Sequence, residues 1–134
     1  MADLSKSAKL GRLVKVQRHL EHMAENELAA TTRARAELAD DMQAVVDAIG
    51  SVDSIHQLFA SIYSSQISRL TAKDQHLKNV QQAQEQKILR EKAKADRLAE
   101  RAGDAREAED GEAQERAIQE LMDIHLVLRG GSES

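Results

Sequence analysis

The chain has 134 residues, 31% of them charged, and a net charge of −4, with no cysteine and no proline. The lack of cysteine excludes disulfides and thiolate metal sites, and the acidic balance argues against general nucleic-acid binding, which needs a basic excess. Alanine supplies 21 residues while Phe and Tyr occur once each, so we expect long helices packed side by side rather than a thick globular core.

The first predicted helix covers about residues 6–49. Apolar residues recur in it at steps of three and four, as they do on one face of an α-helix. The stripe is narrow and lies among charged residues, which is typical of a coiled-coil seam. Its predicted members are Leu10, Leu13, Leu20, Ala24, Leu28, Thr31, Ala34, Leu38, Met42, Val45 and Ile49.

A turn is predicted at residues 50–54, Gly-Ser-Val-Asp-Ser. Glycine is a poor helix former, and Ser and Asp favour turns and N-caps. The break lies between two helical patterns, so we predict a hairpin of two antiparallel helices. A hairpin symmetric about Val52 pairs residues whose numbers add to about 104, so that Leu20 faces Gln84.

The second predicted helix covers about residues 55–102. Spacings of seven and eleven are mixed in its apolar pattern, which predicts an irregular supercoil with stutters. The predicted seam is Ile55, Phe59, Ile62, Gln66, Leu70, Leu77, Val80, Gln84, Ile88, Ala95, Leu98, Ala102 and Ala105.

Residues beyond about Ala99 have no partner on the first helix in this register. An acidic helical extension is predicted at 103–128, and its two glycines, Gly103 and Gly111, favour a bend or local disorder within 102–111. The apolar turn at 118–128 is then expected to pack back onto the base of the hairpin or onto another copy. Residues 129–134 are predicted to be a disordered tail. The whole chain is thus expected to be a single elongated all-α domain.

No catalytic signature is present. The glycines fit neither phosphate-binding fingerprint, and a Ser-His-Asp triad requires a pocket that two helices do not provide. His19 and His22 share a helix face, but closed metal sites need three or four ligands. We therefore expect no enzyme activity, no cofactor and no metal. With neither a long apolar run nor a secretory signal, we expect a cytoplasmic protein that does not insert into a membrane.

Two surfaces are candidates for partner binding. At the base, five basic residues in 6–18 have no acid between them and are expected to lie against a second basic stretch. The predicted partner-binding residues here are Arg12, Lys15, Arg90 and Lys94. The surface is either a solvated face or is covered by an acidic partner or by the chain's own acidic extension.

Near the tip, Phe59 and Tyr63 are four residues apart and share a helix face. We expect Phe59 to serve the seam, Tyr63 and Ile67 to lie beside it, and Met42 and Val46 to extend the apolar stripe. The aromatic pair either locks the end of the hairpin or forms a docking surface, since aromatics are frequent interface anchors.

The stretch Leu10–Ala30 resembles the first helix of the FliJ/YscO family, the stalk proteins of flagellar and other type III export engines. The second half is similar in layout from Leu58 to Leu98, and the likeness covers roughly Ala8 to Asp123. It implies an antiparallel two-helix coiled coil that inserts into the export ATPase ring and contacts the export gate and the export chaperones. It also implies peripheral attachment to the inner membrane through the export apparatus.

Two other interpretations remain open: a self-associating structural coiled-coil rod and a small client-holding chaperone. The stalk interpretation predicts a monomer or weak dimer, whereas a structural rod predicts a stable oligomer. The sequence does not distinguish a flagellar system from an injectisome.

Overall fold

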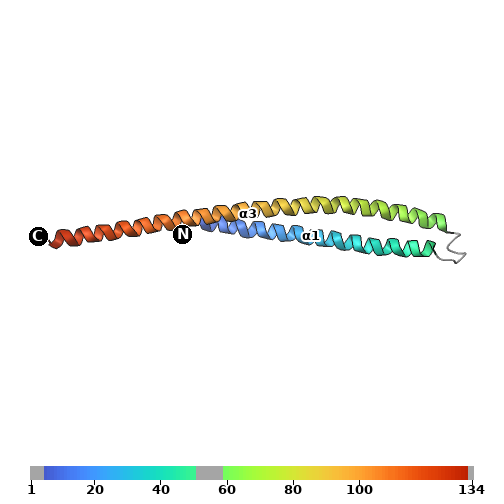
Figure 1. Cartoon of the computed structure of the whole chain (residues 1–134), viewed down its shortest axis with the longest axis horizontal. Coiled ribbons are helices and arrows are strands. Elements are labelled where there is room, and N and C mark those ends of the chain that lie inside the picture. Colours follow the sequence, from blue (N-terminus) through green and yellow to red (C-terminus); the bar gives the residue numbers. More distant parts are fainter. Residues whose placement is uncertain (1–4, 51–58, 133–134) are drawn as a thin grey trace. The chain divides into compact units, whose positions relative to one another are not determined.

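The computed structural model describes residues 5–50 and 59–132. These residues form two α-helices, α1 (Lys6–Ile49) and α3 (Ala60–Ser132), with no strand in the described part. The helices run antiparallel and pack against each other (Figure 1). The predicted all-α helical hairpin is therefore confirmed, while residues 51–54 of the predicted turn lie outside the described residues. The contacts divide the chain into two units, Met1–Arg18 with Ala93–Ser134 and His19–Lys92.

In the unit His19–Lys92, the α1 side of the seam follows a regular seven-residue repeat. Its buried members are Ala24, Thr31 and Leu38, and the seam predicted from Ala24 to Val45 is confirmed except that Arg35 shares a position with Ala34. Thr31 places its Oγ1 3.2 Å from the carbonyl of Glu27, so the buried hydroxyl is satisfied within the helix.

The α3 side of this unit is also a regular repeat. The half-buried positions that alternate at four and three residues are Tyr63, Ile67, Leu70, Asp74, Leu77, Gln81, Gln84, Ile88 and Glu91. The predicted mixture of spacings was wrong because it left out charged and polar seam residues such as Asp74 and Gln81. The predicted seam residues Gln66, Leu70, Leu77, Val80, Gln84 and Ile88 are half-buried. Phe59 and Ile62, both assigned to the seam, are 45% and 50% exposed.

The register of the hairpin differs from the prediction. Arg35 bonds to Asp74, and Glu27 lies 3.5 Å from Lys87, so the paired residue numbers add to 109 and 114 rather than about 104. The connection is longer than the predicted five-residue turn, since α1 ends at Ile49 and α3 begins at Ala60. When the connection is longer, each residue of α1 lies opposite a residue further along α3. The predicted pairing of Leu20 with Gln84 is therefore wrong.

In the other unit, the first turns of α1 pack on a stretch of α3 rich in small residues. Ser7 bonds to Glu109 and Arg18 to Asp96, which fixes α1 against 96–109. The half-buried α3 residues between these bonds are Leu98, Ala99, Ala102 and Ala105, and Ala95 is fully buried. On α1 the seam positions are Leu10, Val14 and Gln17, whereas the predicted seam residue Leu13 is 51% exposed.

Beyond this contact, α3 continues as a single helix. It passes through Gly103 and Gly111 and ends at Ser132, with no glycine at positive φ among the described residues. All residues from Asp110 to Gly131 are exposed, so the predicted bend and fold-back do not occur. Each glycine costs a helix about 1 kcal/mol, which the good helix formers around it offset. The helix also includes 129–132, which were predicted to be a disordered tail.

Candidate protein-binding surfaces

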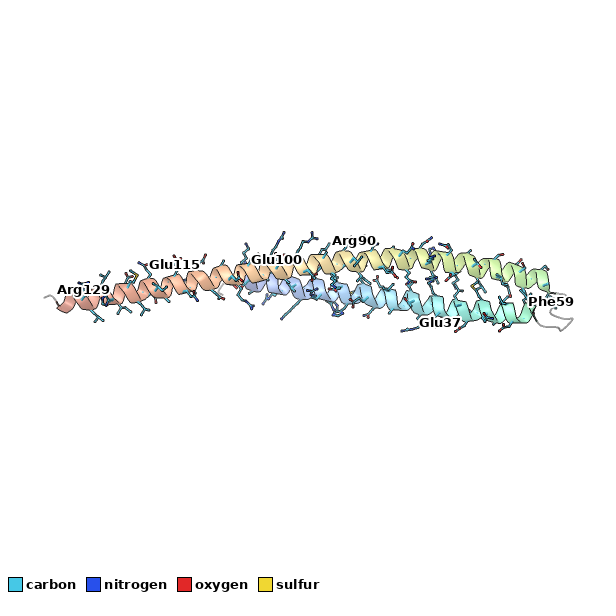
Figure 2. The ribbon with its side chains drawn as sticks, viewed as in Figure 1. Glu37, Phe59, Arg90, Glu100, Glu115 and Arg129 are labelled. Atoms are coloured by element: carbon cyan, nitrogen blue, oxygen red, sulfur yellow. The ribbon has the colours of Figure 1, made fainter. Side chains whose placement is uncertain are left out.

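The predicted apolar surface near the tip is divided by the structure into two groups. Phe59 and Val46 are 45% and 47% exposed, and Figure 2 shows Phe59 at the start of the α3 ribbon. Met42, Tyr63 and Ile67 are instead half-buried in the seam. The expected roles of the two aromatics are thus reversed: Tyr63 packs between the helices, and Phe59 presents its ring to the surroundings.

The reversal follows from the seam phase. Tyr63 is seven residues before Leu70 and fourteen before Leu77, so it continues the seven-residue repeat toward the connection. Phe59 precedes Tyr63 by four residues, but it lies before the first residue of α3, where its carbonyl accepts the Tyr63 amide at 3.0 Å. Nearly half of its surface is accessible to a partner.

The basic residues of α1 face a different stretch of α3 from the one predicted. Because of the register, 6–18 lies along 96–109, which contains five acids and three bases. The expected repulsion between two basic stretches is therefore absent. Arg12 and Lys15 remain exposed, and Lys15 borders a shallow groove whose floor includes Gly11, Val14 and Gly103.

Lys94 and Arg90 are also exposed, in different units of the chain. Lys94 borders a second shallow groove with Gln17, Arg97 and Arg101, which makes a local concentration of positive charge. Arg90 belongs to the unit His19–Lys92 and extends from α3 in Figure 2. All four predicted basic residues are accessible, and Lys15 and Lys94 border different grooves.

Arg35 joins the two helices inside the unit His19–Lys92. Its Nε donates to Asp74 Oδ1 at 3.0 Å and its Nη1 donates to Gln81 Oε1 at 2.9 Å. The hydrogen bond from Arg35 lowers the pKa of Asp74 below its ordinary value of 3.8, and the same bond raises the pKa of Arg35. Both residues are charged and occupy seam positions, so neither is part of the apolar pattern of the sequence.

Glu109 caps the beginning of α1 from the opposite helix. Its carboxylate accepts the Ser7 backbone N–H at 3.0 Å and the Ser7 hydroxyl at 2.5 Å. The first N–H groups of a helix have no acceptor within the helix, and the dipole there favours negative charge. These hydrogen bonds from Ser7 lower the pKa of Glu109 below its ordinary value of 4.5. The correct register was needed to find this pair.

Two further apolar surfaces are exposed, and the one on α1 was not predicted. Near the C-terminus, the large apolar residues are 55% to 75% exposed: Ile118, Leu121, Met122, Ile124, Leu126, Val127 and Leu128. In the first half of α1 the exposed ones are Leu13, Val16, Leu20 and Met23. Two of these four had been placed in the seam because the phase of the repeat was misread at that end of the helix.

Within the described residues, no group of three or more His, Asp or Glu side chains is arranged to hold a metal ion. His22 pairs instead with Glu25, at 3.3 Å. Neither described helix contains a segment long and apolar enough to cross a membrane.

Comparison with protein-family models, curated proteins and solved structures finds no match to this chain. The likeness to FliJ/YscO proteins therefore stays a prediction, and it depends on the residues and layout described above.

Proposed function

We propose that this chain is a non-enzymatic, protein-binding hairpin of a bacterial flagellar or type III export apparatus. In this role it links the export ATPase ring to the export gate and to the chaperones that deliver substrates. The observation that carries the proposal is the antiparallel helical hairpin in which α3 continues past the start of α1. This is the architecture that the resemblance to FliJ/YscO stalk proteins implies.

Two of the surfaces support separate contacts. Phe59 and Val46 offer exposed apolar side chains for the export gate, next to a seam that includes the half-buried Met42, Tyr63 and Ile67. The exposed cations Arg12, Lys15, Arg90 and Lys94 offer charge for the ATPase. Charged rims mainly steer association, whereas aromatic anchors supply binding energy, so the two contacts are expected to respond differently to salt.

The test is binding of the purified chain to the cytoplasmic domain of an export gate protein, measured by calorimetry. The double variant Phe59→Ala, Val46→Ala is expected to bind about tenfold more weakly or worse, since an interface anchor contributes on the order of 1–2 kcal/mol. Its melting temperature should stay near that of the wild type, because both side chains are half exposed.

Two controls make the result interpretable. Tyr63→Ala should lower the melting temperature, because Tyr63 packs in the seam. Leu89, which is 60% exposed, is not part of the proposed gate-binding surface, so Leu89→Ala should change neither binding nor stability. A wild-type chain that binds neither the gate domain nor the ATPase would overturn the proposed function.

A second candidate function is a self-associating structural coiled coil. The exposed apolar residues of 118–128 favour it, because large apolar patches on a helix usually mark an interaction surface. Light scattering over a concentration series separates the candidates: a structural rod is expected to be a stable oligomer at every concentration, whereas a stalk protein is expected to be a monomer or a weak dimer.

A further inference from the structure

The end of α3 carries an apolar stripe that does not belong to the seam of the hairpin. Continued past Glu109, the seam positions fall on Glu112, Arg116, Gln119 and Asp123, all of them polar. The C-terminal stripe, defined as the apolar residues Ile118, Leu121 and Leu128 together with His125, lies on another face at steps of three, four and three. All four residues are exposed, and Figure 2 shows this part of α3 without a neighbouring helix.

The beginning of α1 carries a second stripe with the same spacing. The N-terminal stripe, defined as Leu13, Val16, Leu20 and Met23, also steps by three, four and three along a continuous helix. Its side chains are between 42% and 58% exposed, because the seam positions of α1 fall on other residues such as Val14 and Gln17. Matching periods on two helices are the requirement for a shared coiled-coil seam.

Charge is complementary between the two stripes. The stretch 6–18 around the start of the N-terminal stripe has five basic residues and no acid. The stretch 110–123 around the start of the C-terminal stripe has five acids and one base. Within one chain the stripes do not meet, because α3 continues without a break and all residues of 110–131 are exposed.

We infer that two copies of this chain pair reciprocally, with the C-terminal stripe of each lying on the N-terminal stripe of the other. The paired helices run parallel, which places Ile118 opposite Leu13, Leu121 opposite Val16, and Leu128 opposite Met23. Only this direction sets the acids of 110–123 beside the bases of 6–18. The opposite direction sets them beside Glu21, Glu25 and Glu27, where like charges repel.

The arrangement closes on itself. A two-fold axis makes each contact twice, so that both C-terminal stripes and both N-terminal stripes are covered in a dimer and no binding surface remains for a third copy. The segment 111–132 is about 33 Å of helix, as long as the 22 residues of α1 that contain the N-terminal stripe.

Cysteine cross-linking tests the contact directly, since the chain has no cysteine of its own. Single variants Val16→Cys and Leu121→Cys are mixed and oxidised; the expected product joins one chain of each kind, because facing seam positions lie within about 6 Å. Val127→Cys is the matched control, because Val127 lies off the stripe and is at least as exposed as Leu121, yet should cross-link to Val16→Cys far more slowly.

Each other outcome overturns the inference. Leu121→Cys linking to itself as fast as to Val16→Cys shows that the C-terminal segments pair with each other. Equal rates with the Val127→Cys control show random collision. No cross-link in any mixture shows that the two stripes do not pair.

Light scattering supplies a second measurement on the purified chain alone. The wild type is expected to shift from monomer to dimer with rising concentration, and Leu121→Glu or Val16→Glu should each raise the dissociation constant about tenfold or more, while Val127→Glu leaves it unchanged. A monomer at every concentration overturns the inference. Neither stripe includes Phe59 or Val46, so failure here is distinct from failure of the gate-binding test.

Discussion

Arg35 shows how a charged residue stabilises a thin helical interface. Its guanidinium bridges Asp74 and Gln81 at seam positions where a two-helix fold has little apolar material to bury. The side chain remains about one third exposed, so the bridge is screened by solvent and its value lies largely in fixing register. A residue of this kind is invisible to a search for apolar periodicity.

The pH dependence of stability should report the Arg35–Asp74 bridge. Because the pKa of Asp74 is lowered in the folded state, the bridge stabilises the fold above the unfolded pKa near 3.8, and this contribution is lost as pH falls through the folded pKa. Asp74→Asn should lower the melting temperature at pH 7 and have a progressively smaller effect as the pH falls below 3.8.

Circular dichroism melts between pH 7 and pH 2.5 provide the measurement, with the exposed Asp40→Asn as the matched control. If Asp74→Asn and Asp40→Asn change the melting curve equally at every pH, the bridge contributes nothing specific. The lowered pKa of Glu109 acts in the same direction, so Glu109→Gln should remove a further part of the acid sensitivity.

At the scale of the element, the two helices could be predicted because their apolar period is strong over many turns. The α1 seam between Ala24 and Val45 was read correctly for this reason. The prediction was wrong at Leu13 and Leu20, which lie on an exposed face, while Gln17 and Glu21 occupy the seam. The leucines indicated the wrong face of α1 in this stretch. Extending the seven-residue repeat from Ala24 toward the N-terminus gives the face that is observed.

The glycines of α3 were overrated as helix breakers. An added Cβ at Gly103 or Gly111 meets no atom within 4 Å. Gly111→Ala should therefore stabilise the exposed end of α3 by about 1 kcal/mol, which slows amide exchange around residue 111 about fivefold.

Hydrogen exchange followed by mass spectrometry measures this effect by peptide. Amides around Leu38, buried in the other unit, serve as the internal reference and should not change. Faster exchange at 105–118 in Gly111→Ala would show that the glycine has a role beyond its propensity.

At the scale of the molecule, the hairpin was predictable and its register was not. The break after Ile49 indicated a connection, but its length decides which residues pair, and no local signal fixed the start of α3 at Ala60. The error moved every predicted contact by several residues. It put the basic end of α1 against Lys94 and its neighbours rather than against Glu109.

If the four exposed basic residues bind an export ATPase, the affinity should depend on salt concentration. Replacing Arg12, Lys15, Arg90 and Lys94 with Glu should weaken binding to an export ATPase about tenfold or more at low ionic strength and remove most of its salt dependence. Surface plasmon resonance at several salt concentrations measures both, and unchanged affinity at low salt would reduce the four cations to a solvated face.

The span of the Ser7–Glu109 contact has a consequence for folding. Its partners are 102 residues apart, whereas Arg35 and Asp74 are separated by 39. Closing the longer loop directly costs about 0.8 kcal/mol more chain entropy, and the cost disappears if nearer contacts form first. The helices should therefore zip together from the connection toward the termini, with the capping of α1 by Glu109 as the last event and the first to be lost in unfolding.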